Sequence, residues 1–203
     1  MNINNHIIEL HVPTIEELYF RQECMSDSET MSYNAGYDVN FTGYHRDTGC
    51  IDFPKESWEN WHKNKLTNPN FFYAYIYDKT KRKFVGYVNF NKNPETEKAT
   101  MGIVIKSEFH GQGYMRPAMK LLIEKARLMG VKYLTDTVPE TRVRALKVFY
   151  DLGFEKCGTI ITKKFDKEEI VAEIEKRLNW RRTILILLLN IKNSSHLTIK
   201  TKE

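Results

Sequence analysis

A short loop with two glycines follows an apolar, β-branched segment and leads directly into a helical pattern. Glycine lets the backbone approach a ligand closely, and the first N–H groups of a helix have no partner within it. The positive end of the helix dipole attracts anions to the same place. This pattern predicts phosphate binding, and an ordinary left-handed turn is the alternative. The residues concerned are His110, Gly111, Gln112, Gly113, Tyr114 and Met115.

Neighbouring elements must hold this loop in place. The strand before it is predicted over Ala99–Lys106, and the helix after it has apolar residues at helical spacing as far as Met129. A further strand is predicted at Tyr133–Thr137, followed by a helix that closes at Leu152-Gly153-Phe154, a sequence typical of a left-handed glycine cap. The predicted order is strand, loop, helix, strand, helix, strand.

This order and spacing resemble the GCN5-related N-acetyltransferase (GNAT) family. The family's phosphate loop reads Gln/Arg-x-x-Gly-x-Gly/Ala, and residues 110–115 match it at Gly113 while departing from it at both ends. The family's next helix reads Asn-x-x-Ala-x-x-x-Tyr and closes with Leu-Gly-Phe. Here these three positions are Arg142, Ala145 and Phe149.

The resemblance covers Lys83–Lys164 and implies a fold and a co-substrate. The fold is a single α/β domain with a central mixed, mostly antiparallel sheet, two splayed parallel strands and flanking helices; Gly102 is expected to form a bulge that starts the splay. The co-substrate is acetyl-CoA, with its pyrophosphate on the loop and its pantetheine in the gap, paired with the backbone like an added strand. Beyond the loop, the implied contact residues are Ile103, Val104, Ile105, Arg142, Ala145, Lys147 and Phe149.

Acetyl transfer to an amine needs a donor for the developing oxyanion and benefits from a proton for the leaving thiolate. A backbone N–H near Ile105 is the implied oxyanion donor. In many family members a tyrosine at the position of Phe149 protonates the thiolate. Phenylalanine cannot donate a proton, so Phe149 cannot take this role. The neighbouring Tyr150 is therefore the candidate acid; water and a purely surface role for Tyr150 are the alternatives.

The amine must also lose a proton, and four side chains near the predicted gap could accept it. Asp136 and Glu140 lie towards the end of the strand beside the gap, and His110 and Glu108 lie next to the loop. A histidine side chain can accept a proton near neutral pH, but the more favoured role for His110 is a hydrogen bond to a backbone group or a phosphate. Glu140 could serve only the dipole of the following helix.

The connection Ser26–Ile51 is long and rich in glycine, tyrosine and asparagine, which is typical of a binding loop. We expect it to face the acceptor, with Tyr33 and His45 as candidate contacts. Trp58 and Trp61 are three residues apart on the next predicted helix and favour core packing over a substrate platform.

The apolar segment Thr183–Ile191 has three readings: the last sheet strand, a strand exchanged between subunits, or another helix. Edge pairing through this segment would allow a homodimer. We expect one acyltransferase-like domain over 1–191 and a polar tail over 192–203. The remaining predicted elements are strands at His6–Val12, Phe71–Asp78, Lys83–Asn91 and Glu155–Phe165, and helices at Pro13–Met25, Pro54–Leu66 and Asp166–Leu178.

Composition excludes several other classes of protein. The net charge of +5 is scattered, without the basic, aromatic-rich stripe of a nucleic-acid binder. We expect no membrane span and no metal site, since the longest apolar run is too short and the histidines are dispersed. Cys24, Cys50 and Cys157 are an odd number without ligand spacing and predict reduced thiols in a cytoplasmic protein.

The sequence therefore predicts an enzyme that moves an acetyl group from acetyl-CoA to a primary amine of a small molecule or peptide. A non-catalytic acyl-CoA-binding or sensing module is the alternative, suggested by Phe149 and Met115. Transfer to a hydroxyl, or of a longer acyl group, is a third. The segments 29–38, 110–119 and 136–156 resemble a branch of the family from low-GC Gram-positive bacteria, and this resemblance implies no substrate.

Overall fold

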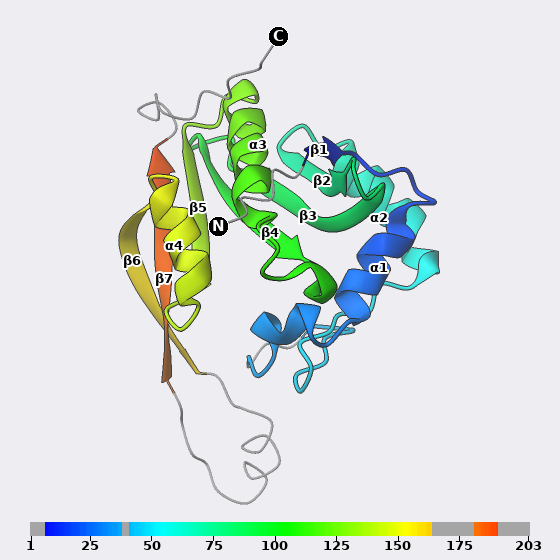
Figure 1. Cartoon of the computed structure of the whole chain (residues 1–203), viewed down its shortest axis with the longest axis horizontal. Helices are drawn as coiled ribbons and strands as arrows, with labels where there is room; N and C mark the ends of the chain where they lie inside the picture. Colours follow the sequence, from blue (N-terminus) through cyan, green and yellow to red (C-terminus); the bar gives the residue numbers. More distant parts are fainter. Residues whose placement is uncertain (1–6, 38–40, 164–180, 191–203) are drawn as a thin grey trace, which may run out of the picture.

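The chain forms one mixed sheet of seven strands with helices on both faces (Figure 1). The computed structural model describes residues 7–37, 41–163 and 181–190, with only the backbone of 159–163 and 181–190. The strands are β1 (Ile8–His11), β2 (Phe71–Asp78), β3 (Lys83–Lys92), β4 (Lys98–Ile105), β5 (Tyr133–Pro139), β6 (Glu155–Lys163) and β7 (Arg181–Asn190). The helices are α1 (Leu18–Ser26), α2 (Trp58–Leu66), α3 (Met115–Leu128) and α4 (Val143–Asp151), with short 3-10 helices at Thr30–Asn34 (η1), Lys55–Ser57 (η2) and Ser107–Phe109 (η3).

The strand order is β1-β2-β3-β4-β5-β7-β6, with one parallel pair, β4 and β5. All other neighbours are antiparallel. The predicted fold class is confirmed: the protein is a single mixed α/β domain.

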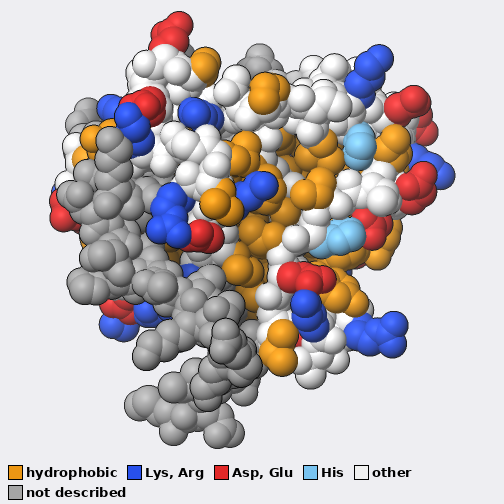
Figure 2. Space-filling view, turned by 90° about the horizontal axis from the view of Figure 1, so that it is seen from above, with side chains coloured by type: hydrophobic (Ala, Val, Ile, Leu, Met, Phe, Trp, Pro, Cys, Tyr) orange, Lys and Arg blue, Asp and Glu red, His pale blue; other side chains and the backbone are white. Residues whose placement is uncertain are grey.

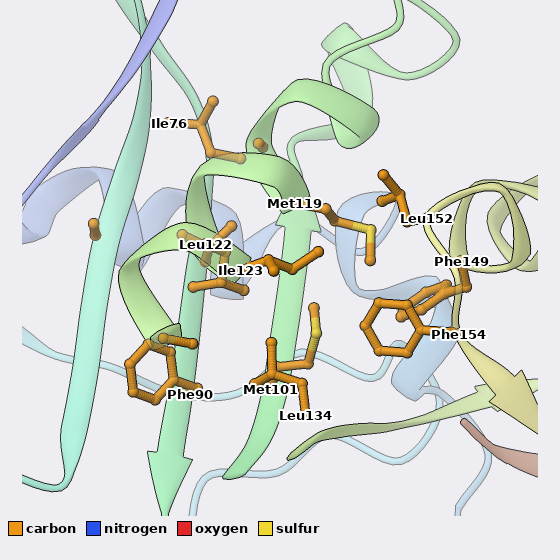
Figure 3. Close-up of a cluster of buried hydrophobic side chains, with 14 of the residues drawn as sticks. Ile76, Phe90, Met101, Met119, Leu122, Ile123, Leu134, Phe149, Leu152 and Phe154 are labelled. Atoms are coloured by element: carbon orange, nitrogen blue, oxygen red, sulfur yellow. The ribbon is translucent and has the colours of Figure 1, made fainter. Parts of the chain in front are cut away.

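Alternation along β2 separates the two faces of the sheet. Phe72, Ala74 and Ile76 point into the main core beneath α3 and α4, whereas Tyr73 and Tyr75 point to the opposite face, towards α1 and α2. Figure 3 shows the main core, where side chains from α3, α4, β4 and β5 meet.

The parallel pair separates soon after it begins. The register of β4 with β5 covers Lys98–Thr100 against Tyr133–Thr135, and in the described part of the chain it extends no further. Beyond Thr100 the two strands diverge (Figure 1). The prediction of a bulge at Gly102 is wrong, because Gly102 pairs with Asn89 in an unbroken β3–β4 register.

The C-terminal segment 181–190 forms β7, which lies between β5 and β6. Of the three predictions for this segment, the sheet strand is the one that the structure has. Dimerisation by edge pairing through it is wrong, because β7 is an interior strand. The predicted helix Asp166–Leu178 and the tail 192–203 lie outside the described residues.

The first helix begins later than predicted, at Leu18 instead of Pro13. The side chain of Glu17 accepts the Thr14 N–H at 2.8 Å and also contacts His11 at 2.7 Å, so the chain makes a turn before α1 begins.

Over the described residues, none of the helices has the length and apolar character needed to cross a membrane. On the face shown in Figure 2, acidic and basic side chains are scattered among exposed hydrophobic ones.

Candidate active site

The loop between η3 and α3 has two residues in the left-handed region, Gly111 at φ 72° and Gly113 at φ 90°. A Cβ at either position would meet nothing within 4 Å, so backbone conformation and not crowding requires glycine here. The N–H groups of Met115 and Arg116 have no partner within α3, and Pro117 has no N–H to leave unsatisfied. The loop and helix end therefore present backbone donors suited to an anion.

Side chains on both sides of the loop fix it to the β2–β3 turn. Tyr114 is buried and donates its hydroxyl to Asp78 at 2.6 Å, while Asp78 also accepts the N–H groups of Thr80 and Lys81. The Gln112 amide oxygen accepts from Lys81 Nζ at 2.8 Å. The polar groups of the Tyr114 and Gln112 side chains are hydrogen-bonded within the protein, so we expect these residues to contact a ligand through their backbone.

His110 donates its Nε2 hydrogen to the carbonyl of Ile105 at 2.7 Å. This geometry matches the sequence alternative in which the histidine binds a backbone group. The bond also closes the turn between the end of β4 and the loop.

The open edge of β4 follows from strand alternation. The Lys106 N–H donates to the Val85 carbonyl of β3 at 3.0 Å, so the backbone groups of Val104 and Lys106 point towards β3. The backbone groups of Ile103 and Ile105 consequently point to the other side, where β5 has diverged. Two N–H groups and the Ile103 carbonyl thus face the gap in which an extended amide-containing ligand could pair.

An ion pair joins Arg116 at the start of α3 to Asp151 at the end of α4. Asp151 contacts both Arg116 and, at 3.7 Å, Lys147. The hydrogen bond from Arg116 holds the pKa of the Asp151 carboxyl below its usual value. Ala145 is half-buried against the core, whereas the Lys147 side chain is exposed. Of these two predicted contacts, Lys147 is the one that carries a charge at the surface.

The position of the family tyrosine is occupied by a core residue. Phe149 is buried and packs edge-on against Phe154, with ring centroids 4.9 Å apart (Figure 3). Tyr150, the candidate acid, is 46% exposed on the outer side of α4. The side chain of Met115 likewise packs against the core and does not stand in the loop.

Asp136 lies on β5 just beyond the last residue that pairs with β4. Burial raises the pKa of its carboxyl from 3.8 to about 7, and a hydrogen bond from the Thr137 N–H opposes that rise. Glu140, the other predicted base on this segment, is exposed. Asp136 is therefore the carboxyl that changes charge near neutral pH at the point where the strands separate.

On the far side of the gap, η1 brings Tyr33 to the site. The Arg142 guanidinium lies 5.2 Å from the centre of the Tyr33 ring, and Tyr33 is hydrogen-bonded to Tyr87. Burial raises the pKa of the Tyr33 hydroxyl, the Arg142 charge lowers it, and the Asp136 charge adds to the rise. Arg142 therefore packs against η1, and its contact with the co-substrate stays a prediction.

The long connection 26–51 is also hydrogen-bonded to η3, which immediately precedes the two-glycine loop. The Ser107 N–H donates to Thr30 Oγ1 at 2.8 Å, and the Ser107 hydroxyl donates to Asp27 at 2.7 Å. His45, by contrast, pairs with Asp52 at 2.8 Å beside an open pocket of about 440 Å³. The structure therefore brings Tyr33 to the gap and gives His45 a partner elsewhere.

Sequence reasoning missed Arg21 on α1. Its guanidinium lies against four aromatic rings, between 4.6 and 5.7 Å from their centroids. The signal was present, because Arg21 falls on the same helical stripe as the buried Leu18 and Met25. We define the aromatic box as Phe53, Trp61, Tyr73 and Tyr87.

Comparison with known proteins agrees with this geometry. The chain is similar in structure to a spermidine N-acetyltransferase from Vibrio cholerae in complex with CoA and spermine, with a TM-score of 0.70 and 13% identity over 92% of this chain and 98% of that one. It is also similar to an N-acetyltransferase from Staphylococcus aureus Mu50, with a TM-score of 0.65 and 15% identity over 91% and 98% of the two chains. No curated protein sequence matches the chain significantly.

At these identities the structural matches establish the fold alone. The sequence itself matches the model of the acetyltransferase (GNAT) family over residues 37–154, which is more than half of the chain. The matched region contains the β4–β5 splay, the two-glycine loop and α4. The protein therefore belongs to the acetyltransferase (GNAT) family.

Proposed function

We propose that the protein transfers an acetyl group from acetyl-CoA directly to a primary amine of a small molecule or peptide. One observation carries the proposal: β4 and β5 separate beyond Thr100 and Thr135, beside a left-handed glycine loop that opens α3. The gap offers amide-pairing groups and the loop offers anion-binding groups. Acetyl-CoA has both an extended diamide arm and a pyrophosphate, so these groups fit it.

Within this proposal, the CoA phosphates contact backbone N–H groups of 111–116, with Lys147 nearby at the surface. The pantetheine arm pairs with Ile103 and Ile105 along β4. When bound, the thioester supplies an activated acetyl group and a good leaving thiolate. The chain must therefore supply orientation, an oxyanion donor and a proton acceptor.

We assign the proton acceptor role to Asp136 and the oxyanion donor role to the Ile105 N–H. A carboxylate whose pKa is about 7 can accept a proton from an ammonium group and is half ionised at neutral pH. The amine nitrogen then attacks the acetyl carbon, the C–S bond breaks, and the amine's second proton goes to solvent. Tyr150, the candidate acid from the sequence, is largely exposed, so we propose that water protonates the thiolate.

We place the reaction in the bacterial cytoplasm, in keeping with Cys24 and Cys50, which are buried thiols outside any disulfide in the described part of the chain. The assignment to the branch from low-GC Gram-positive bacteria remains a prediction. The acceptor of the Vibrio cholerae neighbour is a polyamine, and its site guides the acceptor class here only through the shared fold.

Calorimetric titration of acetyl-CoA and CoA into the purified protein tests the cofactor site. We expect micromolar binding, weakened at least about tenfold in Gly113→Glu, because a carboxylate and a strained backbone enter the phosphate loop. Gly130→Glu is the matched control: Gly130 has φ 72° at the far end of α3, where the same strain leaves the loop intact. Absence of CoA binding by the wild type would exclude the proposed function.

A non-catalytic acyl-CoA sensor is the second candidate, and the burial of Phe149 at the position of the family acid favours it. Both candidates bind acetyl-CoA, so thiol release separates them. Acetyl-CoA at saturation with a panel of primary amines releases CoA thiol if the protein is an enzyme. Tight binding with no release above the buffer rate for any amine would favour the sensor.

A further inference from the structure

The Arg21 side chain is half-buried, and its guanidinium packs against four aromatic rings. It lies 4.6 Å from the centre of the Trp61 ring and 5.0 Å from that of Phe53. The centres of the Tyr73 and Tyr87 rings lie 5.2 and 5.7 Å away. Such contacts stabilise a guanidinium without satisfying its hydrogen-bond donors. Its Nε is buried and has no hydrogen-bond partner in the described part of the chain.

No acidic side chain pairs with Arg21 among the described residues. Glu23, which is also on α1, pairs with Lys106, and Lys106 pairs with Glu108 as well. A buried charge without a counter-charge is costly, and arginine cannot avoid the cost by losing its proton. A cation without a counter-charge in the protein can bind an anionic group of a ligand.

The aromatic box adjoins the proposed reaction site on one side and an open pocket on the other. Tyr87 of the box is hydrogen-bonded to Tyr33, which lies within the electrostatic range of Asp136 and of Arg21. Phe53 of the box also lines the pocket of about 440 Å³ between α1 and the residues preceding α2. The aromatic box therefore adjoins both an open pocket and Tyr33, whose hydroxyl is affected by the charges of Arg21 and Asp136.

We propose that Arg21 binds a carboxylate carried by the acceptor, so that the acceptor is an amine that also bears a carboxylate and not a polyamine. This inference rests on the proposed function and specifies its acceptor class. A carboxylate supplies the missing acceptor for the planar guanidinium, which binds carboxylates in a bidentate manner. Arg142 beside Tyr33 adds a second positive charge that a polyamine would have to approach, which disfavours that class.

Product analogues that differ only in charge test this proposal without turnover. The probes are N-acetyl amino acids and their carboxamides, compared pair by pair. Trp61 reports binding, because the guanidinium lies over its ring. The titrations use a protein in which Trp58 and Trp180 are replaced by phenylalanine.

For at least one pair we expect the acid to bind at least about tenfold more tightly than the amide, which corresponds to about 1.4 kcal/mol. Arg21→Met should abolish this preference, and Arg21→Lys should keep part of it. Arg127→Met is the control and should keep all of it, because Arg127 is exposed on α3 and pairs with Glu124. Circular dichroism checks that each variant folds.

Three outcomes overturn the proposal. Acids and amides that bind alike in the wild type, or fail to bind at all, remove the carboxylate site, and this result needs no variant. A preference that survives in folded Arg21→Met assigns it to another residue. Spermidine turned over faster than every amino acid would place the acceptor among polyamines. In each case acetyl-CoA binding in the calorimeter remains, so the failure is distinct from failure of the proposed function.

Discussion

The guanidinium of Arg142, at the start of α4, lies 5.2 Å from the centre of the Tyr33 ring in η1. This contact joins two segments separated by more than a hundred residues across the gap between β4 and β5. It joins η1 to the start of the helix that bears Phe149.

A double-mutant cycle measures this link. We expect Tyr33→Leu and Arg142→Met to show a coupling of about 0.5–1 kcal/mol in the free energy of urea unfolding, the range for a partly exposed cation–π pair. Arg142→Met should also change the CoA dissociation constant by less than about threefold, because the guanidinium packs against Tyr33. Strictly additive single variants would show that the two side chains do not interact in solution.

The pH dependence of the rate should report Asp136. Because burial raises its pKa to about 7, the wild-type kcat/KM should increase as the pH rises through about 7 and the carboxylate forms. Asp136→Asn should lower kcat/KM by about 10²–10⁴ and remove this limb of the profile. Glu140→Gln is the control, since Glu140 is exposed, and its profile should match the wild type. A limb that persists in Asp136→Asn would transfer the role to another group.

The same carboxyl should make the protein less stable at high pH. Its pKa is raised on folding, so its contribution is fully present below the unfolded value of 3.8 and is lost as the pH rises through about 7. Asp136→Asn removes the ionised form and should raise the free energy of unfolding at pH 8.5 by more than about 1 kcal/mol, with little change at pH 4. Urea unfolding at the two pH values checks the sign; a variant that is less stable at pH 8.5 contradicts it.

Local patterns predicted most of the elements, and resemblance predicted their arrangement. Phe71–Asp78 has the bounds expected from its flanking turns, and Gly153 has φ 86° as expected of a helix-ending glycine. The splay between β4 and β5 has no local signal, because strand pairing depends on residues far apart in sequence. Gly102, offered as that signal, pairs normally with Asn89.

The site was harder to predict because it depends on burial. Asp136 and Glu140 were equal candidates in the sequence, and only their different exposure separates them. Arg21 was overlooked although it interrupts an apolar helical stripe. The pairing of Arg21 with the aromatic box requires α1, α2, β2 and β3 to converge, which periodicity in a single segment cannot reveal.

Tyr150 provides a test of the leaving-group acid. It is 46% exposed and lies next to the buried Phe149, so we expect Tyr150→Phe to change kcat by less than about threefold. Thiol release at saturating acetyl-CoA measures this. A fall of tenfold or more would restore Tyr150 as the acid predicted from its sequence position.

The buried hydrogen bond from Tyr114 to Asp78 should hold the phosphate loop in place. Asp78 is fully buried and loses a charge-assisted donor in Tyr114→Phe, which we expect to cost about 1–3 kcal/mol in the free energy of unfolding. CoA affinity should fall with it, because Tyr114 immediately precedes the N–H groups at the start of α3. Tyr19→Phe is the matched control, because the Tyr19 side chain is exposed, and it should change neither quantity. Loss of stability with unchanged CoA affinity would show that the loop keeps its shape without this bond.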